Sequence, residues 1–160
     1  MRAVDRLLAH EDFRAAIAAI EAKEAQRRFC RHGLAHALDV ARILWILVLE
    51  NQHPFDKETV YLTALLHDLG RSTTDADHDL AGAQLADRLL ADCGLDASRR
   101  QEICAAIGAH RSKSDRLDPS TADLATLLVL ADKKSRPCFR CPAASDCYWP
   151  ETLKNHTITY

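Results

Sequence analysis

The chain has 160 residues, 48% of them hydrophobic, which suits one globular domain with a full core. Its 21 basic and 23 acidic residues give a formal net charge of -2, so the composition does not favour nucleic acid as a partner. The first residues lack the apolar stretch of a signal peptide, and the longest apolar run, residues 43–49, is too short to span a bilayer. We therefore expect a cytoplasmic protein with no membrane partner.

Few glycines and prolines and many alanines and leucines favour helices, and no segment is typical of a strand. Apolar residues at helical spacing predict a first helix over residues 4–23. The segment 34–49 is apolar almost all round, which is typical of a buried central helix. After a break at Pro54, Asp56 is placed to cap a helix that runs to Leu69.

The second half of the chain predicts three more helices. One covers residues 79–93 and ends at a glycine, and the next starts at Asp96 or Ser98. Asp118 and the proline after it predict the start of a helix over residues 119–135. The fold class we expect is all-α, a bundle of five to seven helices.

The composition changes after residue 136, where two prolines and three cysteines occur within a few residues. A segment so short and so rich in proline has no core of its own. We expect residues 1–136 to form the helical bundle and residues 137–160 to form a cysteine-rich tail packed on the same domain.

His67 and Asp68 close an apolar run at the end of a helix. An imidazole next to a carboxylate makes a poor core but a good metal site, and the C-terminal end of a helix attracts cations. Gly70 follows, and there we expect left-handed backbone. His36 and Asp132 lie in equally apolar helices, where an unpaired polar group is costly. Nitrogen and oxygen ligands without thiolate favour iron, manganese, zinc or magnesium.

Two further histidines are candidates for a second ion. His78 opens a helix, and Gly82 one turn later permits the close approach of another backbone or of a ligand. His110 ends a helix, a position that also suits an imidazole for purely structural reasons.

The ordered polar residues resemble the ligand set of the HD-domain superfamily of metal-dependent phosphohydrolases: His36, His67, Asp68 and Asp132. Segments 31–41 and 64–71 are similar to the two leading motifs of that superfamily, and segment 130–133 is similar to its last motif. The resemblance covers about residues 28–136.

The additional histidines, His78 and His110, resemble those of the dinuclear branch of that superfamily. This branch includes a hydrolase of diadenosine tetraphosphate, which the chain resembles, and phosphodiesterases of cyclic di-GMP. The Gly-Tyr-Pro signature of the phosphodiesterases is absent, and Arg71 stands where many members have lysine.

The resemblance implies a hydrolase that cleaves a phosphoester or phosphoanhydride of a nucleotide or similar small phosphate compound through a metal-bound hydroxide. Two divalent metal ions, iron first or else manganese, would be bridged by Asp68. The implied ligands are His36, His67, Asp68, His78, His110 and Asp132. The implied catalytic residues are Asp68, Arg71 and Lys133, and basic residues near the ligands are candidates for phosphate contacts: Arg71, Arg111, Lys113 and Lys133.

Two alternatives remain open at this point. One is a mononuclear nucleotidase, in which His78 and His110 contact the substrate instead of a metal. The other is a redox- or metal-responsive module that binds a phosphate ligand without hydrolysing it. The sequence is also compatible with a homodimer.

Three cysteines in the tail form a second candidate site. Cys138 and Cys141 have the C-x2-C spacing of structural zinc and iron–sulfur sites, and Cys147 follows six residues later. Cys30 is the expected fourth ligand, with His32 and His156 as alternatives. Zinc and a [4Fe-4S] cluster both remain possible occupants. The two other cysteines lie in helices, where we expect them to act as small core residues.

Overall fold

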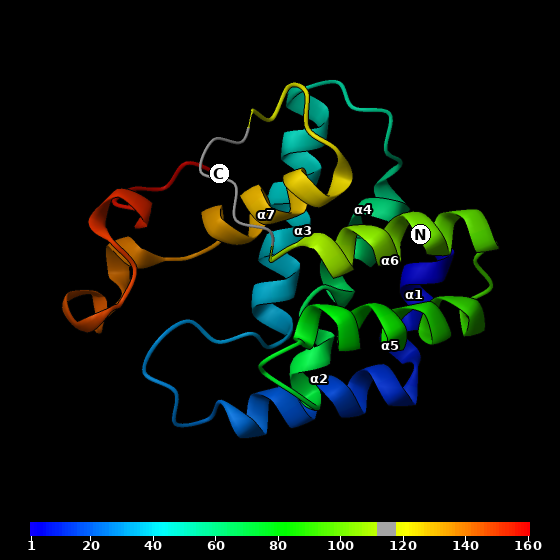
Figure 1. Ribbon diagram of the computed structural model, residues 1–160, viewed down its shortest axis with the longest axis horizontal. Coiled ribbons are helices and arrows are strands. Elements are labelled where there is room, and N and C mark those ends of the chain that lie inside the picture. The colour runs from blue at the N-terminus through cyan, green and yellow to red at the C-terminus, as the bar shows by residue number, and fades with distance from the viewer. Residues whose placement is uncertain (112–117) are drawn as a thin grey trace.

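Seven α-helices build the protein in the computed structural model, which describes residues 1–111 and 118–160 (Figure 1). They are α1 (Arg2–Ala9), α2 (Glu11–Lys23), α3 (Leu34–Glu50), α4 (Lys57–Leu66), α5 (His78–Asp92), α6 (Ala97–Ala109) and α7 (Leu124–Lys134). A short 3-10 helix, η1 (Leu69–Ser72), follows α4. The described residues contain no strand, so the all-α prediction is confirmed. None of the helices within these residues is both long and apolar enough to cross a membrane.

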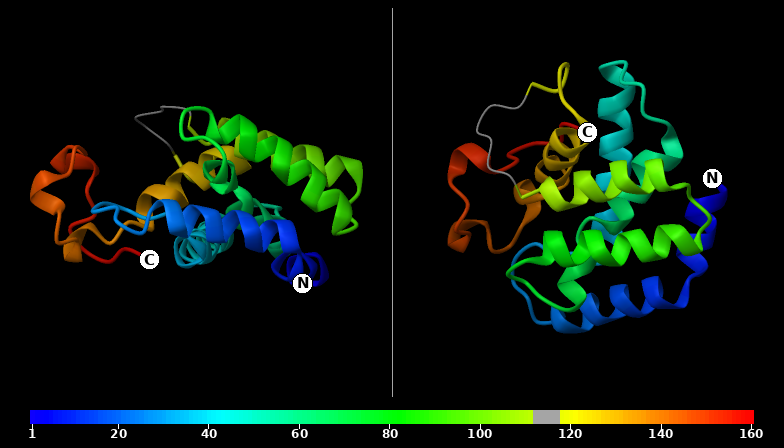
Figure 2. Two further views of the ribbon diagram at one scale, coloured as in Figure 1. Left: turned by 90° about the horizontal axis from the view of Figure 1, so that it is seen from below. Right: turned by 45° about the vertical axis from the view of Figure 1, so that its right-hand side comes forward.

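The central helix is α3, which packs against α4 and α7, while α5 packs against α6 and η1 (Figures 1 and 2). Leu44 and Leu47 of α3 are fully buried against residues of α4 and α7. A second apolar cluster joins α1 and α2 to α4, α5 and α6, with Phe13 and Leu62 among its buried members.

The first helix was predicted as one segment over residues 4–23, and that prediction is wrong. The chain bends at His10, whose backbone is extended, and the His10 side chain accepts a hydrogen bond from the Asp12 amide as the N-cap of α2. Apolar residues on both sides of the bend still reach the core, so their spacing gave no sign of the break.

The start of α7 also differs from the prediction. Asp118 and Pro119 lie in a turn, in which Asp118 accepts hydrogen bonds from Ser120, and the helix begins only after Asp123. Asp123 accepts from the amide of Thr126 as the true N-cap. The buried face of the helix begins at Leu124, directly after Asp123. Packing of this face therefore favours Asp123 over Asp118 as the N-cap.

The tail consists of three 3-10 turns: η2 (Cys138–Arg140), η3 (Ala144–Asp146) and η4 (Glu151–Leu153). It lies on the same side of the bundle as the loop between α2 and α3 (Figures 1 and 2). The side-chain amide of Asn155 donates to the carbonyls of Lys133, Lys134 and Arg136, which ties the tail to the end of α7.

Candidate metal centre

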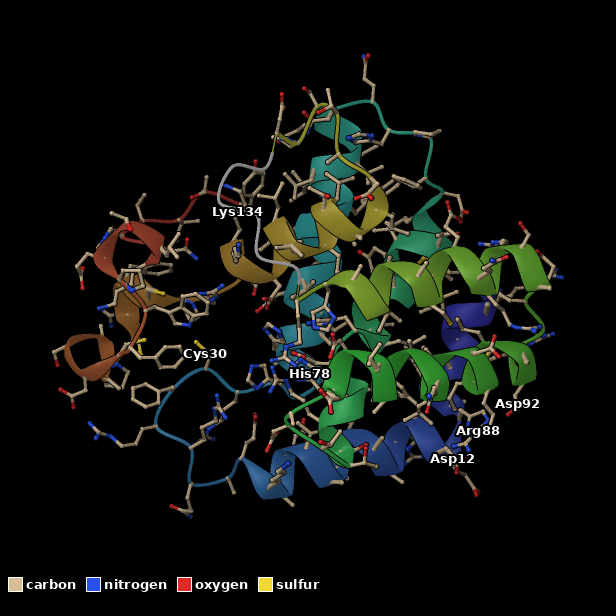
Figure 3. All side chains as sticks on the ribbon, in the orientation of Figure 1. Asp12, Cys30, His78, Arg88, Asp92 and Lys134 are labelled. Atoms are coloured by element: carbon tan, nitrogen blue, oxygen red, sulfur yellow. The ribbon has the colours of Figure 1, made fainter. Side chains whose placement is uncertain are left out.

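The centre lies where the ends of several helices meet, because each polar side chain stands at or near a helix terminus. His36 is in the first turn of α3, and His67 and Asp68 link α4 to η1. His78 opens α5 and points toward the middle of the bundle (Figure 3). His110 caps the C-terminal end of α6, and Asp132 lies in the last turns of α7.

Asp68 is the centre of this arrangement. Its Oδ2 lies 3.2 Å from Nε2 of His67 and 3.5 Å from Nε2 of His36. Its Oδ1 lies 3.3 Å from Nε2 of His78 and 3.8 Å from Nε2 of His110. The two oxygens of one carboxylate therefore face two different pairs of histidines.

The potential ligand atoms form two groups with room for one ion each. His36, His67 and Asp132 make one group, and Asp68, His78 and His110 make the other, with the atoms of each group within 4.8 Å of one another. His36 Nε2 also lies 3.4 Å from Asp132 Oδ1. The structure thus brings together all six side chains that the sequence singled out.

Backbone carbonyls fix the orientation of three of the imidazoles. Nδ1 of His67 lies 2.7 Å from the Ala64 carbonyl, Nδ1 of His78 lies 3.1 Å from that of Asp75, and Nδ1 of His110 lies 2.6 Å from that of Ile107. A carbonyl can only accept, so each Nδ1 carries the proton and the lone pair of the neutral ring is on Nε2. Such contacts are how proteins orient histidine ligands toward a metal.

The Nε2 atoms of His36, His67 and His78 are buried and have no hydrogen-bond partner in the described part of the chain. A buried nitrogen without a partner is costly, and three that converge on carboxylates need a cation. The donor set, four imidazoles and two carboxylates, therefore fits divalent transition metals.

Comparison with known proteins identifies the family of the chain. A family model for the HD domain matches residues 33–136. An uncharacterized protein of Clostridium beijerinckii is 34% identical over 140 residues, which are 86% of this chain and 85% of that protein.

The chain belongs to the HD-domain family. The HD domain is the domain of a superfamily of metal-dependent phosphohydrolases, in agreement with the sequence motifs. A bifunctional uridylyltransferase/uridylyl-removing enzyme of Nitrobacter hamburgensis is 37% identical over 62 residues, which are 39% of this chain and 7% of that enzyme. No solved structure matches the chain.

Asp68 and the five side chains around it, which we call the HD centre, form two groups, and the pKa values of the histidines differ between the groups. Burial of His36 would lower its pKa, but the carboxylates of Asp132 and Asp68 outweigh burial and raise the pKa to about 9. Burial and the charge of His67 lower the pKa of His110 to about 4, and burial also lowers the pKa of His78. His78 and His110 are therefore neutral at pH 7, which is the form that binds metals.

Both carboxylates are ionised, although Asp68 is buried and Asp132 is half-buried. Burial would raise the pKa of Asp68, but the charge of His67 and the contacts with His36 and Arg71 hold it well below its usual range. The pKa of Asp132 is lowered to about 2 because contact with His36 and the charge of His67 outweigh burial.

Close packing of two glycines places α5 against η1. A Cβ on Gly70 would lie 2.0 Å from the carbonyl oxygen of His78 and 2.5 Å from the amide nitrogen of Gly82. Gly70 does not have the left-handed backbone that we expected, since the described glycine with a positive φ is Gly94. The close approach of backbones explains Gly70, and it brings His78 to Asp68.

The predicted basic residues lie in different settings. The Nε–H of Arg71 donates to Asp68 Oδ1 at 2.7 Å, so this side chain is part of the centre. Lys133 is half-buried on α7, next to Asp132. Arg111 binds the start of α5 through the Ala76 carbonyl and Asp79, and Lys113 lies outside the described residues.

Two residues that support the centre were not predicted from the sequence. Ser135 places its Oγ 3.4 Å from Nδ1 of His36, and Lys23 of α2 pairs with Asp75 at 2.7 Å in the loop before His78. Both are common surface residue types at unremarkable positions, so only the folded arrangement reveals them.

The four cysteines of the second candidate site line one cavity: Cys30, Cys138, Cys141 and Cys147. Burial, and to a smaller extent the three neighbouring thiols, raise the pKa of Cys30, while Arg136 opposes this shift. The two alternative ligands lie elsewhere. Nδ1 of His32 contacts Glu24 Oε1 at 2.7 Å, and Nε2 of His156 lies 3.0 Å from the Glu151 carbonyl.

The other two cysteines were expected to be small core residues. Cys93, which directly follows α5, is buried in the core, and Cys104 of α6 is partly exposed and packs against the same cluster.

Proposed function

We propose that this HD domain is a dinuclear phosphohydrolase that cleaves a phosphoester or phosphoanhydride of a nucleotide or a similar small phosphate compound. The observation that carries the proposal is the position of Asp68, whose Oδ2 faces His36 and His67 and whose Oδ1 faces His78 and His110. A carboxylate placed in this way joins two ions, whereas a mononuclear site needs only one of its oxygens.

The proposed ligands divide between the two sites. His36, His67 and Asp132 would hold one ion, His78 and His110 the other, and Asp68 would bind both. The bound ions would supply positive charge to the phosphoryl oxygens and lower the pKa of a water molecule toward neutrality. We propose iron or manganese, because imidazole and carboxylate donors without thiolate suit these metals.

The protein would orient the substrate with its own cations. Arg71 has a mostly buried guanidinium whose Nε binds Asp68, so the rest of its fork lies beside the centre. Lys133 adjoins Asp132 on α7. The partial similarity to a uridylyl-removing enzyme supports a nucleotide-type substrate, because removal of a uridylyl group breaks a phosphoester bond.

The test is metal content measured together with hydrolysis. Purified protein would be loaded anaerobically with iron or manganese, analysed for bound metal, and assayed against bis-p-nitrophenyl phosphate and a panel of nucleotides. We expect about two ions per chain at the histidine centre. His110→Ala should retain one ion and lose most turnover, and Asp68→Ala should lose both binding and hydrolysis.

A matched control is His53→Ala, because the His53 ring binds the Pro119 carbonyl instead of Asp68. This variant should keep both ions and full turnover. One ion per chain in the wild type, unchanged by His110→Ala and accompanied only by a higher KM, would replace the proposal with a mononuclear nucleotidase. Stable phosphate binding without turnover under any metal would favour a ligand-binding module.

A further inference from the structure

The cavity between the tail and the α2–α3 loop borders the metal centre at His36, and the hydrolytic proposal leaves it without a role. It has a volume of about 390 Å³ and is lined by all four cysteines of the second candidate site. Cys30 points from the loop toward the tail, while the other three come from the tail itself (Figure 3). Sequence segments more than one hundred residues apart thus direct their thiols into one space.

The tail needs something to hold it in place. None of its three 3-10 turns contains a buried residue, and two of its aromatic side chains, Phe139 and Tyr148, are largely exposed. Ala143 is the tail residue that joins the buried apolar set among the described residues. Apart from the Asn155 hydrogen bonds to the end of α7, a segment with so little apolar burial needs a covalent or coordinate link to order its cysteine-bearing turns.

The walls of the cavity carry an excess of basic side chains, although Arg27 pairs with Glu24, Arg28 with Asp146 and Lys154 with Glu151. Six cationic side chains line it, against the one carboxylate of Asp39: Arg27, Arg28, Arg31, Arg136, Arg140 and Lys154. Arg136 is only 7% exposed, stacks on the Trp149 ring at 4.3 Å, and has a buried Nη1 without a hydrogen-bond partner in the described chain. A buried guanidinium without a partner is costly, so the cavity is built for an anionic occupant.

The spacing of the thiols distinguishes a single ion from a cluster. In a tetrahedral zinc site with Zn–S bonds of about 2.3 Å, the thiolates lie about 3.8 Å apart. Among the described residues, the groups of three or more ligand atoms within 4.8 Å of one another are the two at the HD centre, and no group of cysteines is among them. The thiols therefore surround a larger space than one ion needs, and four cysteines are the usual ligands of a [4Fe-4S] cluster.

We propose that Cys30, Cys138, Cys141 and Cys147 hold a [4Fe-4S] cluster in this cavity. Four thiolates make the complete cluster an anion, which supplies the counter-charge for Arg136. The cluster links the tail to the loop that precedes α3. It also lies behind the metal centre, since His36 and Ser135 line the same cavity on the Nδ1 side of the His36 ring.

A phosphate substrate is the other anion that this cavity could bind. The position of the cavity relative to the metal centre argues against such binding. The remaining five ligands of the HD centre and Arg71 do not line the cavity. A phosphate bound there would therefore lie behind His36, away from the Asp68 carboxylate. The cavity contacts His36 on the Nδ1 side of the ring, opposite to the side that faces Asp68, and this position suits a structural cluster.

The decisive measurement is acid-labile sulfide, because iron at the HD centre brings no sulfide with it. Protein purified without oxygen, or reconstituted with ferrous iron and sulfide, should contain about four sulfides per chain and show a broad visible absorption. Cys141→Ser and Cys147→Ser should lose the sulfide and the colour. Cys104→Ser is the matched control, because Cys104 lies on α6 outside the cavity, and it should keep both.

Two further measurements keep the proposal open to refutation if a cysteine variant folds poorly. Asp68→Ala should lose the ions of the HD centre and still contain the full sulfide, which separates this proposal from the hydrolytic one. Removal of the cluster from wild-type protein by an oxidant and a chelator should make the tail more sensitive to protease than the bundle.

Three outcomes would overturn the proposal. A colourless protein with one zinc per chain that Cys141→Ser removes would assign a single ion to the site. Pyrophosphate binding to sulfide-free protein that survives Asp68→Ala and is lost in Arg136→Ala would assign the cavity to a phosphate ligand. Four thiols that stay free of metal after anaerobic reconstitution would leave the site without a metal.

Discussion

Ser135 Oγ lies 3.4 Å from Nδ1 of His36, and among the four histidines around Asp68 it is His36 whose Nδ1 faces a side chain instead of a backbone carbonyl. The same hydroxyl donates to the Asp132 carbonyl at 2.7 Å, so it is held in place to accept from the imidazole. The orientation of three ligand rings is therefore fixed by the fold, while that of the fourth can be changed by mutation.

Ser135→Ala should leave the fold intact and weaken metal retention. Loss of an outer contact to a metal-bound histidine typically costs about 10–100-fold in metal affinity or activity, and we expect the lower part of that range because 3.4 Å is a long contact. Competition with a fluorescent chelator would measure the affinity. Ser120→Ala, which alters a turn away from the centre, is the control; equal affinities in the two variants would contradict the role of Ser135.

Arg71→Ala should lower turnover more than it lowers stability. Its Nε–H donates to the Asp68 oxygen that also faces His78 and His110, so the substitution frees the carboxylate to rotate and removes a cation beside the phosphate. We expect a fall in kcat/KM of about 10–100-fold. Arg71→Lys should restore the charge but not the planar fork, and steady-state kinetics with both variants would separate the two contributions. Unchanged kinetics in Arg71→Ala would show that this contact is dispensable.

Gly70→Ala should disrupt the contact between η1 and α5. The added methyl would lie 2.0 Å from the His78 carbonyl oxygen, and both neighbours are backbone atoms, so the helix itself must shift. Overpacking of this kind costs about 1–3 kcal/mol or more of the free energy of unfolding. Urea denaturation and metal analysis should show lower stability and loss of the ion at His78.

The matched glycine substitution is Gly108→Ala in α6. Its new methyl would lie 3.9 Å from the Ala83 side chain, an ordinary contact, and alanine is the better helix former by about 1 kcal/mol. This variant should be as stable as wild type or more so. Equal effects of the two substitutions would contradict the packing argument.

Asp56 should make a pH-dependent contribution to stability. Burial would raise its pKa, but hydrogen bonds from Thr59 and the charge of Arg99 outweigh burial and lower the pKa. Because the folded pKa lies below the unfolded value, this contribution is fully present above the unfolded pKa of about 3.9 and is lost as the pH falls through the folded pKa.

The test compares Asp56→Ala with wild type by urea denaturation at several pH values. At pH 7 the variant should be less stable by about 1 kcal/mol, since Asp56 is the N-cap of α4. The difference should shrink on acidification toward pH 3. Asp56→Asn keeps a capping oxygen without a titrating group, so a gap to wild type that does not vary with pH in this variant would contradict the electrostatic part of the argument.

The sequence singled out the polar side chains that the structure brings together, because burial leaves a distinct pattern. His36, His67 and Asp132 stand in runs of apolar residues, where a polar side chain without a partner is too costly to be incidental. The helices themselves were also predictable wherever a cap and a periodic apolar face coincide, as at Asp56 and Asp96.

The errors occurred where local signals competed. Two aspartates offered N-caps before α7, and the packing of Leu124 selected Asp123 over Asp118. The bend at His10 has neither proline nor glycine to mark it, and the special position of Gly70 depends on a helix that begins eight residues later. Contacts between segments distant in sequence determine these helix ends and this close packing, and the local sequence of one segment does not reveal such contacts.

The three bonds from the Asn155 amide to carbonyls at the end of α7 have a practical consequence. The last carbonyls of a helix have no partner within the helix, and here a residue about twenty positions downstream donates to them. Asp132 lies in the last turn of the same helix. Removal or displacement of Asn155 would therefore fray the end of α7 next to Asp132.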